Sequence, residues 1–122
     1  MGRHVLLIED EPNIIEAIRF ILTRDGWQVD TLSDGAEAMA TIRRTRPDVL
    51  ILDVMLPGRS GYEILQDLRA DPEYAQLPVL MLTARGQMRD REQAERYGAS
   101  RFIAKPFANA DIVAALRALV GS

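Results

Sequence analysis

The 122-residue sequence contains no cysteine and only one histidine, and these absences exclude several kinds of site. Without cysteine there is no disulfide framework, no thiolate zinc site and no cysteine nucleophile. His4 has no second histidine with which to form a ligand set, and we interpret it as a residue at the start of a strand. Glycine-rich phosphate loops of the Walker or dinucleotide type are also absent.

The sequence also lacks an excess of basic residues and any long apolar run. Its 15 Lys and Arg residues stand against 18 Asp and Glu, and the net charge of -3 argues against nucleic acid as the main partner. No segment reaches the roughly 20 apolar residues of a membrane span, and no signal peptide is recognisable. We therefore expect a soluble cytoplasmic protein that binds neither nucleic acid nor a membrane directly.

What the sequence does contain is typical of one globular domain, residues 1–122. The hydrophobic fraction is 48% and the charged fraction 27%, which suits a protein with a core. Short apolar segments alternate with longer amphipathic ones. Strands are predicted at 4–8, 27–32, 48–52, 78–82 and 101–104, and helices at 12–26, 34–46, 60–69 and from 109 onward.

Local signals mark several helix ends. The segment "SGYE" (60–63) has the form of a capping box. Ser33 or Asp34 is a candidate cap of the second helix, and Asn109 is the expected cap of the last one. The polar segment 86–97 has poor helical amphipathicity and is compatible both with a solvated helix and with a mobile element at a signalling face.

This alternation predicts an α/β fold in which a parallel sheet is covered by helices on both faces. The segments "VLIL" (49–52) and "VLML" (79–82) are continuously apolar, as central parallel strands are. The mixed segment "WQVDTL" (27–32) suits an edge strand. Together with right-handed crossovers, these features favour a flavodoxin-like, doubly wound (βα)5 fold with strand order 2-1-3-4-5.

Four of the five predicted strands end next to acids, a hydroxyl or an amine, whereas the second, at the edge, leads only to Ser33 and Asp34. In such a sheet, ligands bind beyond the carboxyl ends of the strands, so these residues are expected at one edge. The residues that follow these four strands are Glu9, Asp10 and Glu11 after the first, Asp53 after the third, Thr83 and Ala84 after the fourth, and Lys105 and Pro106 after the fifth.

This set of side chains has a chemical logic. Two like charges 4 Å apart repel by about 4 kcal/mol at an effective dielectric near 20, so clustered carboxylates need a cation. Mg²⁺ typically takes one or two carboxylates together with waters and phosphate oxygens. Beside such an ion, Lys105 and Thr83, the carboxylate of Asp53 can attack a phosphoryl group.

Each of these residues also has an ordinary structural interpretation when it is taken alone. Asp53 is then a turn residue, and the acids before Pro12 favour a helix N-terminus. Thr83 caps a helix, and Lys105 is a solvated surface charge. Their joint placement at one edge of the sheet favours the chemical interpretation.

Four segments in order resemble the signature segments of receiver domains of two-component response regulators, and they cover essentially the whole chain. They are "LLIEDEP", "VLILDVMLPGRSGYEIL", "PVLMLTARG" and "YGASRFIAKPF". The resemblance implies a CheY-like fold and a signalling phosphoacceptor rather than an enzyme. The phosphoryl donor would be a sensor histidine kinase or a histidine phosphotransfer protein.

The resemblance implies a role for individual residues. Asp53 matches the phosphoacceptor, Asp10 a direct ligand of Mg²⁺ (with Mn²⁺ as an alternative ion) and Glu9 a ligand that acts through water. The backbone carbonyl of Met55 matches the group that completes the metal site.

Further matches concern the phosphoryl group and the switch. Thr83 and Lys105 match the hydroxyl and the amine that hold the phosphoryl oxygens. Phe102 matches the aromatic switch residue, which rotates inward when Thr83 moves. Lys105–Pro106 matches a peptide bond that is usually cis.

Other positions bear on phosphate loss and on assembly. Met55 and Arg85 match positions that tune dephosphorylation, and because both can screen the attacking water we expect slow loss. A downstream output domain, an effector protein or a second copy would bind the face from the fourth to the fifth helix. Tyr97, Arg101 and Ala115 depart from the pattern of the transcription-factor branch, which puts the dimer of that branch in doubt.

Three other functions are weighed against this one. A pseudo-receiver would signal without phosphate, but Asp10, Asp53, Thr83 and Lys105 are all present. A haloacid-dehalogenase-type phosphatase needs an acid where Met55 stands. Binding of FMN is opposed by the acids of "EDEP" (9–12). Whether the chain stands alone or is part of a longer regulator is left open by the sequence.

Overall fold

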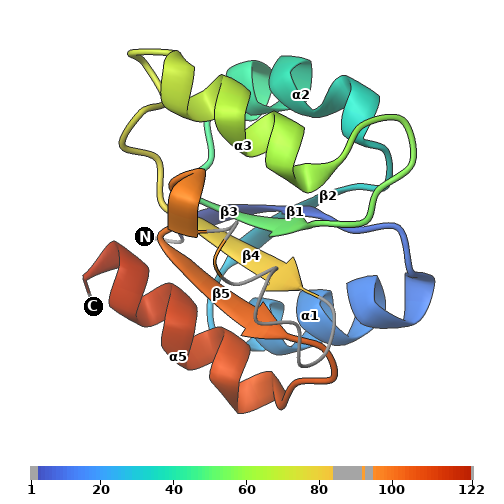
Figure 1. Cartoon of the computed structure of the whole chain (residues 1–122). Helices are drawn as coiled ribbons and strands as arrows, with labels where there is room; N and C mark the ends of the chain where they lie inside the picture. The colour runs from blue at the N-terminus through green and yellow to red at the C-terminus, as the bar shows by residue number, and fades with distance from the viewer. Residues whose placement is uncertain (1–2, 84–91, 93–94, 122) are drawn as a thin grey trace.

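A computed structural model of the chain describes residues 3–83, 92 and 95–121, which form a five-stranded parallel sheet between two layers of helices (Figure 1). The order of the strands is β2-β1-β3-β4-β5. This order confirms the predicted flavodoxin-like, doubly wound fold. The strands are β1 (His4–Ile8), β2 (Gln28–Leu32), β3 (Val49–Asp53), β4 (Val79–Thr83) and β5 (Arg101–Ala104).

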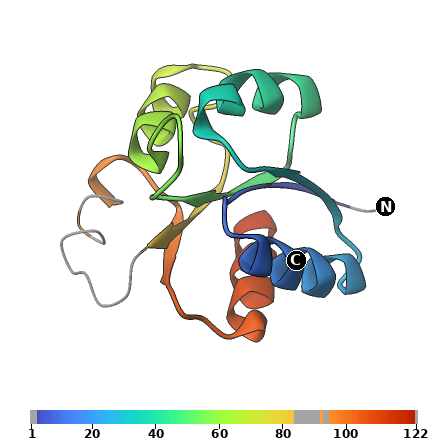
Figure 2. The ribbon, with the colours of Figure 1, turned by 90° about the vertical axis from the view of Figure 1, so that its right-hand side faces the viewer.

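The helices pack on the two faces of the sheet in pairs. Helices α2 and α3 cover one face and α1 and α5 cover the other, as Figure 2 shows from the side. The predicted segment 86–97 lies mostly outside the described residues, and Arg85 lies outside them as well. The described helices are α1 (Pro12–Arg24), α2 (Ala38–Thr45), α3 (Gly61–Ala70) and α5 (Asn109–Val120), with a 3-10 turn, η1 (Gly35–Glu37), before α2.

The central strands β1, β3 and β4 are largely apolar because both faces of the sheet are covered there. In β1, Leu6 and Ile8 join the core beneath α2 and α3, whereas Val5 and Leu7 join the core beneath α1 and α5. Every residue of β3 and β4 is buried, and β2, at the edge, is only partly buried. Alternation therefore sends neighbouring side chains into two separate cores.

Most of the helix boundaries follow the local signals. The capping box of Ser60 and Glu63 is present at the start of α3. Asp34 accepts a hydrogen bond from the amide of Ala36 at 2.7 Å, but it caps η1 rather than a single helix from 34 to 46. The prediction that Asn109 caps the last helix is wrong. Ala108 already has the extended backbone of an N-cap (φ -86°, ψ 141°), so Asn109 falls inside the first turn.

Among the described residues, no helix has the length and the apolar character needed to cross a membrane.

Candidate functional site

The register of the parallel strands brings the predicted side chains to one edge of the sheet. Ile8 pairs with Leu52, so Glu9 stands level with Asp53, the last residue of β3. Asp53 pairs with Leu82, which leaves Thr83 one residue further out on β4. Asp53 and Thr83 are both buried, at 3% and 4% exposure. The carboxylate of Asp53 and the hydroxyl of Thr83 are thus buried at the edge of the sheet and do not lie in solvated turns.

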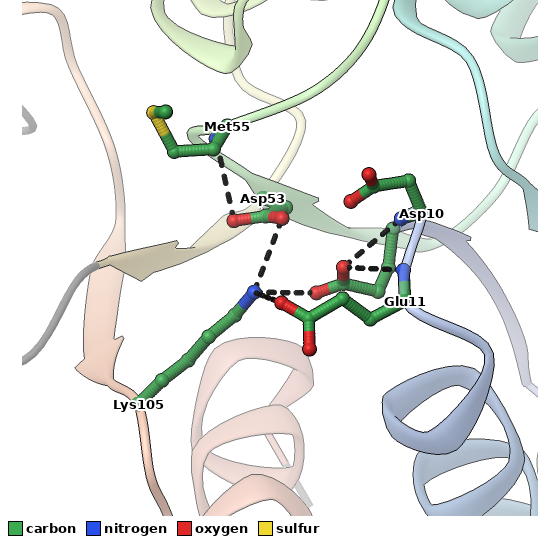
Figure 3. A network of polar contacts seen from close by, with 6 residues as sticks. Asp10, Glu11, Asp53, Met55 and Lys105 are labelled. Carbon is green, nitrogen blue, oxygen red and sulfur yellow. Dashed lines mark hydrogen bonds and ion pairs between the residues drawn. The ribbon is translucent and has the colours of Figure 1, made fainter.

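Lys105, which follows β5, reaches across this edge to three carboxylates (Figure 3). Its Nζ lies 3.1 Å from Asp53 Oδ2, 3.0 Å from Glu9 Oε1 and 3.5 Å from Glu11 Oε1. Burial opposes the charge of the amine, but the carboxylates of Glu9 and Asp53 outweigh that effect and raise the pKa of Lys105 above its ordinary value. Lys105 is therefore charged and pairs with the acids around it.

Glu9 is fully buried, and its two oxygens have different surroundings. Oε2 accepts hydrogen bonds from the backbone amides of Asp10 at 2.9 Å and Glu11 at 3.0 Å. Oε1 faces Lys105 as an ion pair, but within the described part of the chain it has no partner in hydrogen-bond geometry. Burial, reinforced by the nearby charge of Asp53, raises the pKa of Glu9 to about 7 although the Glu11 amide and Lys105 counteract it.

The three predicted metal ligands are brought together by the fold. One carboxylate oxygen each of Glu9, Asp10 and Asp53 lies within 4.8 Å of the others. Carboxylate oxygens are the donors that Mg²⁺ prefers, and an open lone pair on Glu9 Oε1 is what a cation or its bound water would engage. A single ammonium, Lys105, does not neutralise three carboxylates. The donor set and its excess negative charge therefore fit a divalent cation.

Met55 lies beside this cluster. Its backbone amide donates to Asp53 Oδ1 at 3.4 Å, a long hydrogen bond. Its side chain is 74% exposed, so the residue approaches the buried site through its backbone. Asp10 is exposed at the opposite side of Asp53, which leaves the acid cluster open to solvent there (Figure 3).

The remaining residues singled out in the sequence lie on β5, on α5 and in the segments that flank β5. Phe102, on β5, is half-buried and packs against the core beneath α2 and α3. The peptide bond between Lys105 and Pro106 is cis. The ring of Tyr97 lies 5.5 Å from that of Tyr62 on α3. Ala115 is buried at 2% exposure, so this position offers no surface for a dimer contact.

Glu11 is expected at the sheet edge without a part in the phosphoacceptor chemistry, and the structure places it in contact with Lys105. Glu11 is the N-cap of α1, yet its side chain makes no capping hydrogen bond. An acid directly before Pro12 was interpreted as support for the helix N-terminus. The contact spans β3 and β4, which lie between β1 and β5, so it depends on the order of the strands and on the reach of the Lys105 side chain. No local signal in the sequence reports it.

Comparison with known proteins shows the family of this chain. Residues 5–117 match the response regulator receiver domain. This chain belongs to that family. The receiver domain is 41% identical over 116 residues to the transcriptional regulatory protein TrcR of Mycobacterium tuberculosis, covering 95% of this chain and 44% of TrcR. It is 37% identical over 120 residues to the phosphate regulon transcriptional regulatory protein PhoB of Escherichia coli, covering 98% of this chain and 52% of PhoB.

A solved structure also resembles the receiver domain closely. The receiver domain of the sensor histidine kinase PA1611 from Pseudomonas aeruginosa superposes with a TM-score of 0.90 at 32% identity, with all of both chains covered. That structure has a magnesium ion coordinated in its active site cleft. The chain spans about half the length of the curated relatives it matches. Receiver domains are signalling phosphoacceptors that work with histidine kinases and output domains. This chain has their fold and carries a cluster of three carboxylates.

Proposed function

We propose that this receiver domain accepts a phosphoryl group on Asp53, in a Mg²⁺-dependent transfer from the phosphohistidine of a sensor histidine kinase or a histidine phosphotransfer protein. The observation that carries the proposal is the position of Lys105. Its ammonium lies within 3.1 Å of both Asp53 and Glu9, beside a cluster of three carboxylates. A cation-compensated acidic pocket of this kind is suited to phosphoryl transfer.

In the proposed reaction, a carboxylate oxygen of Asp53 attacks the phosphorus in line while the bond from phosphorus to the histidine nitrogen breaks. The histidine leaves with the electrons of that bond. Lys105 holds an oxygen of the phosphoryl group, and Thr83, buried at the end of β4, donates its hydroxyl to another. Glu9, Asp10, Asp53 and the Met55 carbonyl would hold the Mg²⁺ or Mn²⁺ ion, which when bound neutralises charge on the phosphoryl oxygens.

The proposed signal begins at the aspartyl phosphate, which adds about -1.5 to -2 charges at neutral pH. Thr83 moves toward this charge, and Phe102 turns into the space that Thr83 leaves. The change shifts the population of the face that includes β5 and α5, where an output domain, an effector or a second copy of the chain would bind. We place the receiver domain in the cytoplasm, where kinases of this class act.

The test of this function is a titration with Mg²⁺ followed by beryllofluoride, which mimics a phosphoryl group on a carboxylate. Backbone amide spectra of the wild-type chain should change in two steps, first around Asp53 and Met55 with Mg²⁺ and then over β5 and α5 with beryllofluoride. Asp53→Asn should lose the second step. A wild-type spectrum that beryllofluoride leaves unaltered would favour a pseudo-receiver that signals without phosphate. Gel filtration of both states would show whether a dimer forms.

A further inference from the structure

The acceptor loop, residues 54–60, connects β3 to α3 and carries Met55. Two glycines outside the loop approach its ends more closely than any side chain would allow. A Cβ atom at Gly61 would lie 2.3 Å from the carbonyl oxygen of Asp53 and 3.0 Å from the Cα of Val54. A Cβ atom at Gly35 would lie 2.2 Å from the carbonyl oxygen of Arg59. Both contacts involve backbone atoms, which cannot move aside as the end of a flexible side chain can.

Both glycines also donate a hydrogen bond to the acceptor loop. The amide of Gly61 donates to the carbonyl of Val54 at 2.9 Å, and the amide of Gly35 donates to the carbonyl of Pro57 at 2.9 Å. Close approach and hydrogen bonding thus act together at each point, because the missing side chain is what lets the two backbones meet. The glycines therefore contact the acceptor loop at two points, one directly after Asp53 and one near the far end of the loop.

The far end of the loop is held independently by side chains. Ser60 and Glu63 form the capping box that starts α3, and Arg59 forms an ion pair with Asp67 one turn further along the same helix. The residues that remain between these anchors are few. Next to Met55, the amide of Val54 donates to the Leu82 carbonyl at 3.1 Å and Leu56 packs against the core beneath α2 and α3. The two glycine contacts act together with these anchors to set the position of Met55.

We propose that Gly35 and Gly61 are positioning residues of the phosphoacceptor site, which fix the acceptor loop and so the direction of the Asp53 carboxylate and the place of the Met55 backbone. This inference rests on the proposed function. Gly35 belongs to the connection after β2, which places no side chain in the acidic cluster, so its role would pass entirely through the loop.

The magnitude of the effect follows from the distances. Cβ contacts below 3.0 Å do not persist, so alanine at Gly61 forces α3 or the Asp53 carbonyl to move by about 1 Å. A displacement of that size at a reacting group typically costs about a hundredfold in rate. The hydrogen bond from the Met55 amide to Asp53 Oδ1 is already long at 3.4 Å and would be lost first.

The variants Gly61→Ala and Gly35→Ala test the inference through Mg²⁺ affinity, measured by calorimetry at a temperature at which circular dichroism shows each variant folded. We expect binding to weaken by about tenfold or more for Gly61→Ala and by a smaller factor for Gly35→Ala. The amide resonance of Met55 should shift in both metal-free variants. Leu68→Ala is the matched control: it lies in the same helix, destabilises the core and should bind Mg²⁺ as wild type does.

Amide hydrogen exchange of the wild type tests the same coupling without a substitution. Because coupling is reciprocal, Mg²⁺ should slow exchange at Gly35 and Gly61 more than at Asp48, whose amide donates to the His4 carbonyl at the opposite end of the sheet. Equal slowing at all three amides, or glycine variants that bind Mg²⁺ within twofold of wild type, would overturn the positioning role. A wild type that binds no Mg²⁺ would instead contradict the proposed function.

Discussion

Asp53 and Lys105 form an ion pair of 3.1 Å at the edge of the sheet, although 52 residues separate them in the sequence. The pair joins the end of β3 to the end of β5 across β4, and Lys105 extends it to Glu9 at the end of β1. The ammonium thus occupies part of the space that a divalent cation would fill. It also supplies part of the positive charge that compensates the carboxylates. Lys105 and Mg²⁺ are expected to compete electrostatically even though both would assist the proposed phosphoryl transfer.

Replacement of Lys105 by methionine should therefore tighten Mg²⁺ binding by about tenfold, because a positive charge close to the metal site is removed. Phosphoryl uptake by the same variant should fall, because the amine no longer holds a phosphoryl oxygen. Calorimetry and intact mass measure the two effects. Lys105→Arg keeps the charge and should bind Mg²⁺ as wild type does. Unchanged affinity in Lys105→Met would show that the ammonium does not face the metal.

Mg²⁺ binding should depend on pH because of Glu9, whose pKa burial raises to about 7. The metal favours the ionised carboxylate, so affinity should be full above pH 7 and should fall by up to about tenfold per unit below it. In the metal-free protein, the contribution of Glu9 to the stability of the fold changes with pH in the opposite direction. The raised pKa stabilises the fold below the ordinary value of 4.5, and this contribution is lost as pH rises through about 7.

The comparison of Tm at pH 6 and pH 8, with and without Mg²⁺, checks both statements. The gain in Tm from Mg²⁺ should be larger at pH 8. Glu9→Gln cannot ionise, so its Tm should lack this pH dependence and its Mg²⁺ binding should be weak at both pH values. A wild-type gain that is equal at the two pH values would contradict the raised pKa of Glu9.

Loss of phosphate from Asp53 should be slow. Met55 stands beside Asp53 with an exposed, apolar side chain, and with Arg85 it is expected to hinder the attacking water. Met55→Asn supplies a polar group that can orient water and should shorten the lifetime of the phosphorylated form. Intact mass followed over time after removal of the donor measures this lifetime. Complete loss of phosphate from the wild type within seconds would contradict the expectation.

Tyr74 should tolerate removal of its hydroxyl. The residue is 7% exposed in the core beneath α2 and α3, and among residues 3–83, 92 and 95–121 its Oη has no hydrogen-bond partner. A buried hydroxyl without a partner costs free energy, so Tyr74→Phe should leave the free energy of unfolding unchanged or raise it by about 1 kcal/mol. Urea unfolding measures the difference. A loss of stability would indicate a partner such as a buried water.

The fold and the place of the site could be predicted from the sequence because both follow from strand composition. Continuously apolar segments such as 49–52 predict central parallel strands, and parallel strands bring their carboxyl ends to one edge. The sequence therefore predicts that the residues at the strand ends, Asp53 among them, lie together at that edge. The polar segment 27–32 predicted the edge strand for the same reason.

What the sequence could not predict depends on tertiary distances. The raised pKa of Glu9 results from full burial, and the contact of Glu11 with Lys105 results from the reach of the lysine side chain past the ends of β4 and β3. The approach of Gly35 to the Arg59 carbonyl depends on how two loops pack. The N-cap of α5 was expected at Asn109 from its side chain, but the extended backbone of Ala108 makes Ala108 the N-cap, and such a backbone angle cannot be read from the sequence.

The central claim is that Asp53 takes up a phosphoryl group in a pocket that needs a divalent cation. The most direct measurement is intact mass after incubation with acetyl phosphate, with Mg²⁺ or with a chelator. The account predicts a gain of one phosphoryl group in the wild type with Mg²⁺, and no gain in Asp53→Asn or after chelation. A wild type that gains no mass, or an Asp53→Asn variant that gains the same mass, would contradict it.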